Sequence, residues 1–253
     1  MTRPQPAEID LRAYAGWLFD LDGVLTATAR IHSRCWKTMF DEFLERLSAR
    51  AGRPFVPFDT GEDYQLYVDG KPRDAGVRDF LASRQITLPE GTDDDGPDVE
   101  TVAGLGRWKN DMVVEAIAAG EVEVFDGSVR LLHRLRGQGI QTAVVSSSRN
   151  CLDVLRSVGI EDLFDAHVDG LVARELQLPG KPAPDTFQEG ARRLGIPEES
   201  AVVVEDAVAG VEAGSAGSFA LVIGVDRGGN RERLVAGGAD VVVSDLDELI
   251  PAT

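Results

Sequence analysis

Short, strongly apolar runs rich in β-branched residues recur along the chain and alternate with amphipathic stretches of helical period. Each run is of strand length and lacks polar alternation, so we expect it to be buried on both faces. The runs are residues 16–19, 142–145, 201–204, 221–225 and 241–243. Strands of this kind between helices are typical of a parallel sheet covered on both sides. The pattern predicts an α/β fold with a doubly wound parallel-sheet core.

Helical stretches fill the spaces between the later runs, and a long helical segment interrupts the alternation after the first run. The helices expected between the later runs are residues 128–136, 151–158, 185–194, 208–213 and 232–236. The interrupting segment has helical period at residues 30–47, 77–82 and 108–118. We therefore expect two domains. The core comprises residues 1–28 and 121–253, and a helical domain is inserted at residues 29–120.

The charge balance excludes several classes of partner. The chain carries 26 Lys and Arg against 43 Asp and Glu, a formal net charge of −17. Because such a surface repels phosphate backbones and anionic lipids, and no basic patch is evident, we expect neither nucleic acid nor membrane as a partner. Cys35 and Cys151 are far apart and lack zinc-site spacing, which favours free thiols in a reducing compartment. With no leader-like N-terminal segment, we expect a cytoplasmic protein. We also expect a monomer.

Two acidic residues, Asp20 and Asp22, directly follow the first apolar run. Side chains alternate along a strand, so both carboxylates can point the same way at its carboxyl end, where α/β sheets bind their ligands. There one carboxylate can hold a hard cation and act as a nucleophile, while the other shuttles a proton. A turn or helix cap is the structural alternative for such a pair.

A second acidic pair, Glu205 and Asp206, follows the run at residues 201–204. If both strand ends adjoin in one sheet, three or four carboxylates converge, which is electrostatically unfavourable without a cation. Mg²⁺ prefers oxygen ligands of this kind. We therefore predict that Asp20, Asp22, Glu205 and Asp206 form a Mg²⁺ site, with helix N-caps as the alternative role for the second pair.

Two further segments can bind an anion. The run at residues 142–145 leads into five polar residues just before a predicted helix, and these are Ser146, Ser147, Ser148, Arg149 and Asn150. Hydroxyls, backbone N–H groups and a helix N-terminus could all face a phosphate there, although an ordinary Ser/Asn cap is the alternative. Lys181 stands before two prolines that fix its loop, and supplies a compact positive charge.

Taken in order, these four motifs resemble those of the haloacid dehalogenase superfamily of phosphotransferases. The resemblance implies a Rossmann-like core with an inserted helical cap domain. It implies that Asp20 is the nucleophile that forms an aspartyl-phosphate, and that Asp22 is the general acid and base. Ser146 and Lys181 would hold the transferring phosphoryl group, which needs in-line positioning and charge neutralisation.

The same resemblance gives the metal an explicit ligand set. Asp20, the backbone carbonyl of Asp22, and Asp206 would bind Mg²⁺, with Glu205 at or near the ligand shell. The residues from Ser147 to Asn150 would contribute to substrate binding.

The inserted segment resembles the cap domain of β-phosphoglucomutases, in which a Thr, a His and a Trp recur at the positions of Thr28, His32 and Trp36. By this resemblance Arg73 and Lys109 would bind the distal, non-transferring phosphate, and His32 would assist Asp22. Thr28 and Trp36 would contribute to substrate binding. On its own, His32 could equally be a helix-surface residue.

The resemblance implies a β-phosphoglucomutase that interconverts β-D-glucose 1-phosphate and glucose 6-phosphate through glucose 1,6-bisphosphate. The expected partner is a small-molecule sugar phosphate. A sugar-phosphate phosphatase of the same superfamily is the alternative, because the two activities share the aspartyl-phosphate and differ in whether water attacks it. A non-enzymatic sugar-phosphate-binding protein would require a broken catalytic set, whereas all the catalytic residues are present.

Overall fold

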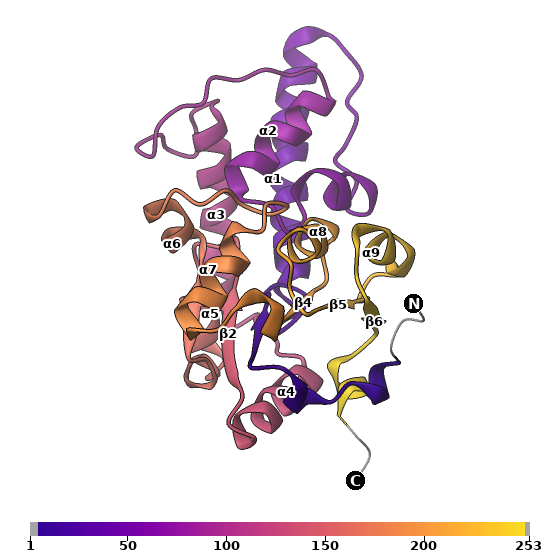
Figure 1. Cartoon of the computed structure of the whole chain (residues 1–253). Coiled ribbons are helices and arrows are strands. Elements are labelled where there is room, and N and C mark those ends of the chain that lie inside the picture. Colours follow the sequence, from indigo (N-terminus) through magenta and orange to yellow (C-terminus); the bar gives the residue numbers. More distant parts are fainter. Residues whose placement is uncertain (1–4, 251–253) are drawn as a thin grey trace. The chain divides into compact units, whose positions relative to one another are not determined.

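The computed structural model describes residues 5–250, which form two compact units. The core unit contains the chain up to Thr28 and again from Val122, and the cap unit is Ala29–Glu121 (Figure 1). The outer ends of the predicted core, residues 1–4 and 251–253, lie outside the described residues.

A six-stranded parallel sheet forms the centre of the core unit, in the order β3-β2-β1-β4-β5-β6. The strands are β1 (Gly16–Phe19), β2 (Gln141–Val145), β3 (Ala166–Val168), β4 (Ala201–Glu205), β5 (Leu221–Val225) and β6 (Val241–Val243). Gly16 pairs with both Gln141 and Ala201, so β2, β1 and β4 are aligned in register and end at the same edge of the sheet. The predicted fold class is confirmed. Strand β3, a three-residue edge strand, was not predicted from the sequence.

Within residues 5–250, six helices belong to the core unit: α4 (Asp126–Gly137), α5 (Cys151–Ser157), α6 (Gly170–Glu175), α7 (Asp185–Leu194), α8 (Val208–Ala216) and α9 (Arg231–Gly237). Helix α7 packs on β1, β2 and β3, α8 packs on β4 and β5, and α9 packs on β5 and β6. A buried apolar cluster that includes Leu18, Val145 and Val203 joins the sheet to Phe187 and Ala191 of α7. Apolar burial of this kind is what the continuous apolar runs predict.

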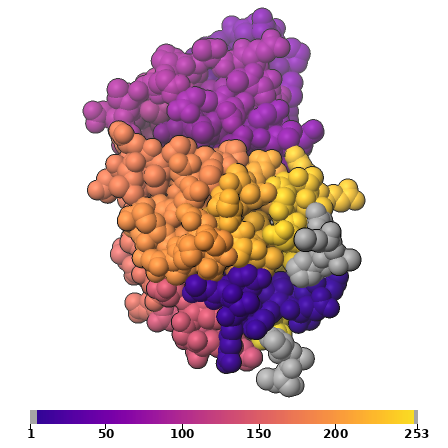
Figure 2. All heavy atoms as spheres, in the orientation of Figure 1, coloured from indigo at the N-terminus to yellow at the C-terminus, as the bar shows by residue number. Residues whose placement is uncertain are grey.

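The N-terminal segment packs against the C-terminal part of the core. Its two 3₁₀ turns, Pro6–Glu8 and Leu11–Ala13, precede β1, and the first packs on β6 and on the 3₁₀ turn Leu246–Leu249. In Figure 2 this segment is indigo and lies at the surface of the core unit.

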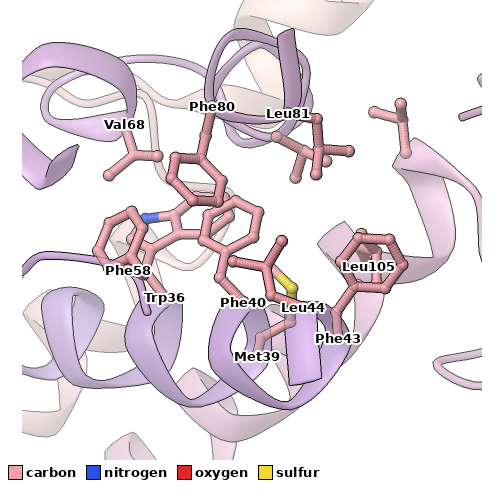
Figure 3. Packing of buried hydrophobic residues seen from close by; sticks show 12 residues of the cluster. Trp36, Met39, Phe40, Phe43, Leu44, Phe58, Val68, Phe80, Leu81 and Leu105 are labelled. Carbon is pink, nitrogen blue, oxygen red and sulfur yellow. The ribbon is translucent and has the colours of Figure 1, made fainter. Parts of the chain in front are cut away.

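The cap unit has a hydrophobic core of its own. It comprises α1, which begins in the core unit (Thr28–Ala51), a π-helical turn (Tyr64–Val68), α2 (Arg73–Ser83) and α3 (Val102–Ala118). The Phe40 ring centroid lies 4.1 Å from that of Phe80, 5.2 Å from that of Phe58 and 5.3 Å from that of Trp36 (Figure 3). This aromatic cluster holds α1 and α2 together.

Helix α3 begins earlier than the helical period of the sequence predicts. Thr101 caps it by accepting from Gly104 N, so the helix runs from Val102 rather than from residue 108. Two glycines in the first turns weaken the helical signal. One of them is required, because a Cβ on Gly104 would lie 2.1 Å from the Val99 carbonyl oxygen.

Cys35 and Cys151 are both buried free thiols, as predicted. None of the helices within residues 5–250 is long and apolar enough to cross a membrane.

Candidate active site

Three carboxylates meet at the carboxyl edge of the core sheet. Glu205 is the last residue of β4, Asp206 follows it, and Asp20 comes directly after β1. The Asp20 N–H donates to the Val204 carbonyl at 2.9 Å, which extends the pairing of β1 with β4 by one residue. Each carboxylate offers an oxygen within 4.8 Å of the other two, with Asp20 and Glu205 buried and Asp206 half-buried.

Lys181 connects two of these carboxylates. Its Nζ donates to Asp20 Oδ1 at 2.5 Å, to Glu205 Oε1 at 2.6 Å and to the Val145 carbonyl at 3.2 Å. The side chain is 1% exposed and its ammonium lies over the Phe187 ring. Burial lowers the pKa of Lys181, but the charges of Asp20 and Glu205 outweigh burial and raise it, so the residue is a cation at neutral pH.

Burial and neighbouring carboxylates disfavour the ionised form of Asp20. Burial raises the pKa of Asp20 well above its usual range, the Lys181 charge opposes this rise, and Glu205 and Asp22 reinforce it. The charge of Lys181 therefore does not offset the burial of Asp20 beside Glu205 and Asp22. Clustered carboxylate oxygens fit a hard divalent cation rather than a soft one.

Two glycines make room for the acidic side chains. A Cβ on Gly23 would lie 1.8 Å from Asp206 Oδ2, and Gly23 also has a positive φ of 88°. A Cβ on Gly210, in α8, would lie 1.7 Å from Glu205 Oε1. Both acidic side chains therefore depend on a glycine at the adjoining position.

Asp22 has a different set of partners from Asp20. Thr28 Oγ1 donates to Asp22 Oδ1, and Ser146 Oγ donates to Asp22 Oδ2 at 3.5 Å. The Thr28 hydroxyl also lies 2.7 Å from that of Thr26. The carboxylate of Asp22 thus links β1 to the start of α1 and to the end of β2. Its backbone carbonyl as a metal ligand remains a prediction.

The segment from Ser146 to Asn150 forms a tight loop after β2. Ser148 N donates to Ser146 Oγ at 3.0 Å, and Asn150 N donates to Ser148 Oγ at 3.1 Å. The loop is half-buried from Ser147 to Asn150. Asn150 precedes α5 but its side chain makes no capping hydrogen bond there, so a simple cap does not explain it. Gly170 N fixes the loop by donating to the Ser148 carbonyl at 3.0 Å.

Within the cap unit, three of the predicted residues come together. His32 and Trp36 lie one turn apart on α1, and Lys109 reaches both from α3. Lys109 Nζ lies 2.6 Å from His32 Nδ1 and 4.8 Å from the centroid of the Trp36 ring, and Lys109 is buried. An ammonium donor at Nδ1 leaves the ring hydrogen of a neutral His32 on Nε2.

Arg73, the fourth predicted cap residue, is the first residue of α2 and is half-buried. Its Nε donates to Asp74 Oδ1 at 3.1 Å. A Cβ on Gly106 would lie 2.9 Å from Arg73 Nε, so Arg73 lies against α3 within one turn of Lys109. The cap unit therefore presents two cations on neighbouring helices.

Two residues near the acidic cluster were not identified from the sequence. Asn230 Nδ2 donates to the Asp206 carbonyl at 3.2 Å, and Arg227 Nε donates to the Gly23 carbonyl at 3.4 Å. Both lie in the polar segment Asp-Arg-Gly-Gly-Asn that follows β5. The rule that identified the other strand-end residues, a polar run directly after a buried strand, would have found them too.

Comparison with known proteins identifies a family. Residues 14–217 match the family described as haloacid dehalogenase-like hydrolase. The chain is 50% identical to a β-phosphoglucomutase of Mycobacterium tuberculosis over 236 residues, which is 92% of this chain and 90% of the relative. It is 30% identical to a β-phosphoglucomutase of Bacillus subtilis, again over 92% of this chain and 90% of the relative.

A solved structure has the same fold. The crystal structure of a β-phosphoglucomutase from Clostridium difficile superposes with a TM-score of 0.74 at 25% identity, and the match covers 93% of each chain. The chain therefore belongs to the haloacid dehalogenase superfamily and, within it, to the β-phosphoglucomutase-like subfamily.

Proposed function

We propose that the chain is a β-phosphoglucomutase that interconverts β-D-glucose 1-phosphate and glucose 6-phosphate. The observation that carries this proposal is the 50% identity to a mycobacterial β-phosphoglucomutase over 92% of the chain. The acidic cluster at the sheet edge, with Lys181 against Asp20, supports phosphoryl transfer as the underlying chemistry.

In the proposed cycle Asp20 carries the phosphoryl group as an aspartyl-phosphate. The 6-hydroxyl oxygen of β-glucose 1-phosphate attacks the phosphorus, the bond from phosphorus to Asp20 breaks, and Asp22 accepts the hydroxyl proton. This step gives glucose 1,6-bisphosphate and free Asp20. The bisphosphate then presents its 1-phosphate to Asp20, which takes the phosphoryl group while Asp22 returns the proton to the C1 oxygen.

The contacts of these two carboxylates fit their different roles. Asp20 is buried and held by Lys181, which suits a nucleophile that must stay in line with the phosphorus. Asp22 is held by Thr28 and Ser146 instead, and this places its carboxylate between the loop after β2 and the start of α1. Lys181 and Ser146 would carry the positive charge and the hydroxyl that hold the transferring group.

Asp20, Glu205 and Asp206 would hold the divalent cation, which we propose is Mg²⁺. When bound, this cation would neutralise the charge that develops on the phosphoryl oxygens. In the cap unit, Arg73 and Lys109 would bind the distal phosphate of the bisphosphate. His32, held by Lys109, would assist Asp22.

The decisive assay supplies β-glucose 1-phosphate with Mg²⁺ and a trace of glucose 1,6-bisphosphate, and measures glucose 6-phosphate and inorganic phosphate together. A mutase accumulates glucose 6-phosphate with little phosphate, and the α anomer serves as the control substrate. Stoichiometric phosphate release without the isomer would identify a sugar-phosphate phosphatase instead.

A substitution in the cap unit tests the proposed distal-phosphate site. Arg73→Ala removes a cation proposed to act in binding, so KM should rise about tenfold or more with a smaller change in kcat. Arg78→Ala is the matched control, because Arg78 lies on the same helix and pairs at the surface with Glu90. Equal behaviour of the two variants would remove Arg73 from the site.

A further inference from the structure

The loop that follows β5 contacts both acidic loops of the core unit. Asn230 Nδ2 donates to the Asp206 carbonyl at 3.2 Å, on the segment after β4. Arg227 Nε donates to the Gly23 carbonyl at 3.4 Å, in the loop that follows Asp20 and Asp22. One loop therefore holds the backbone of both segments that bear the carboxylate cluster.

This loop is fixed in its own conformation by Asp226. Asp226 N donates to the Val243 carbonyl at 2.7 Å, which anchors the loop to the end of β6. Its Oδ1 accepts from the N–H groups of Gly229 at 2.7 Å and Asn230 at 2.9 Å. A side-chain acceptor that binds two successive N–H groups closes a tight turn. The turn sets the direction in which Asn230 leaves the loop.

The side chain of Asn230 does not cap the helix that follows it. Asn230 directly precedes α9, where an asparagine ordinarily accepts a hydrogen bond from the first turn of its helix, but its side chain makes no such bond. Its amide nitrogen donates to Asp206 instead, and its Oδ1 is buried without a partner among residues 5–250. Burial of an amide oxygen without a partner has a free-energy cost, so capping of α9 does not account for this arrangement.

Arg227 is held in place by three other groups. Its NH1 donates to the Ser244 carbonyl at 2.9 Å and to Asp245 Oδ2 at 2.7 Å. The guanidinium carbon lies 3.8 Å from the centroid of the Phe125 ring, a stacked cation–π contact. These contacts fix the plane of the guanidinium and aim its Nε at Gly23.

The two held segments touch each other at Gly23 and Asp206. Gly23 adjoins the Asp206 carboxylate so closely that a Cβ at this position would lie 1.8 Å from Asp206 Oδ2. A small shift of either backbone therefore changes where the Asp206 carboxylate can lie. Mg²⁺ requires near-ideal ligand geometry, and the groups behind its ligands commonly control affinity.

We propose that Asn230 and Arg227 are positioning residues that hold Asp206 and the loop after β1 in the geometry a divalent cation needs. They act through the backbone of Asp206 and Gly23 and contact no reacting atom. This inference rests on the proposed cation site and is independent of which sugar phosphate reacts.

The test is a titration of Mn²⁺ alone into the metal-free full-length protein, with free Mn²⁺ followed by electron paramagnetic resonance. Asn230→Ala should bind Mn²⁺ about tenfold more weakly than the wild type. Its unfolding midpoint in EDTA should stay within about 4 °C of the wild type. In turnover assays it should need about tenfold more Mg²⁺ for half-maximal rate and reach a kcat close to that of the wild type. Should Asn230→Ala not fold, Arg227→Lys carries the same test.

Arg231→Ala is the matched control. Arg231 also lies at the start of α9 and donates to a backbone carbonyl, that of Val242 at 2.7 Å, in β6 rather than in an acidic loop. It should leave Mn²⁺ affinity unchanged. Wild-type affinity in Asn230→Ala, equal weakening by Arg231→Ala, or no Mn²⁺ binding by the wild type would each overturn the inference. If the wild type showed no mutase turnover but Asn230→Ala still bound Mn²⁺ more weakly than the wild type, only the proposed function would be overturned.

Discussion

The core unit and the cap unit hold their functional side chains in different ways. In the core, Asp20 and Glu205 lie at strand ends, fixed by backbone pairing and by ion pairs with a buried lysine. In the cap, Lys109 of α3 contacts His32 and Trp36 of α1, and a hydrophobic cluster that includes Phe40 and Leu105 packs the two helices together. The core thus depends on charge balance among buried groups, whereas the cap depends on apolar packing.

Each unit should therefore be sensitive to a different kind of substitution. A change in the number of buried charges should affect the core most, and a change in packed volume should affect the cap most. Substitutions in the two units, each with a matched control, test this difference in sensitivity.

The largest expected effect is on chemistry in the core. Asp20→Asn removes the proposed nucleophile with little change in shape, so turnover should fall by at least about 10³-fold while the circular dichroism spectrum is retained. Asp153→Asn, at an exposed position on α5, is the control and should keep turnover within about twofold. Substantial activity in Asp20→Asn would rule out the proposed nucleophile.

Removal of the buried lysine charge should be the largest effect on stability. Lys181→Met leaves Asp20 and Glu205 without their buried partner, and should lower the free energy of unfolding by about 3–5 kcal/mol in urea titrations without metal. Lys71→Met in the cap unit breaks a surface pair with Asp79 and should cost less than about 1 kcal/mol. Similar losses in both variants would contradict the contrast in charge sensitivity.

Truncation of a central cap aromatic tests the packing side of the comparison. Phe40→Ala leaves a cavity among Trp36, Phe58 and Phe80, and should lower the free energy of unfolding by about 3 kcal/mol. Phe55 is 41% exposed in the same unit, so Phe55→Ala should cost less than about 0.5 kcal/mol. A null result for Phe40→Ala in chemical denaturation would mean that this cluster does not stabilise the cap.

The smallest expected effect concerns one carboxylate of the core and depends on pH. Hydrogen bonds from Arg192 and Arg193 lower the pKa of Glu189 from 4.5 to about 2. A lowered pKa stabilises the folded state above pH 4.5, and this contribution is lost as the pH falls from about 4.5 towards 2. Glu189→Gln should therefore cost about 2 kcal/mol at pH 7.

The pH series for Glu189→Gln compares its urea midpoint with that of the wild type from pH 7 down to pH 3. The difference between the two midpoints should narrow progressively as the pH falls below about 4.5. Glu90→Gln, which removes an exposed partner of Arg78 in the cap unit, should show no pH-dependent difference of this size. If the difference in urea midpoint between Glu189→Gln and the wild type stayed constant with pH, the charge of Glu189 would not be its source.

Most of the fold could be predicted because buried parallel strands leave an unambiguous apolar signal. The predicted runs coincide with β1, β2, β4, β5 and β6 to within one residue. Strand β3 could not be found, because it has only three residues, lies at the sheet edge and carries His167 at its centre. Helix α3 was predicted too short, since the glycines that its packing requires are poor helix formers.

The strand-end residues of the candidate site could be predicted from the residue pattern, whereas the roles of the cap residues came from the resemblance to known mutases. That pattern, with the edge alignment of parallel strands, brought together Asp20 and the second acidic pair. The contacts of Lys181 with Asp20 and Glu205 join positions 161 and 24 residues apart in the chain, so no local pattern reveals them. The same holds for Lys109 and His32, which are 77 residues apart and meet only through helix packing.

The two chain segments that lead into and out of the cap unit are bonded to each other. Thr26 and Val124 form an isolated antiparallel bridge, and Ala27 N donates to the Glu123 carbonyl at 2.8 Å. The whole insert therefore starts and finishes at one place on the core, like a domain placed in a hairpin loop. A short turn in place of residues 29–121 would close the same hairpin, so we expect the strand order of the core not to depend on the cap.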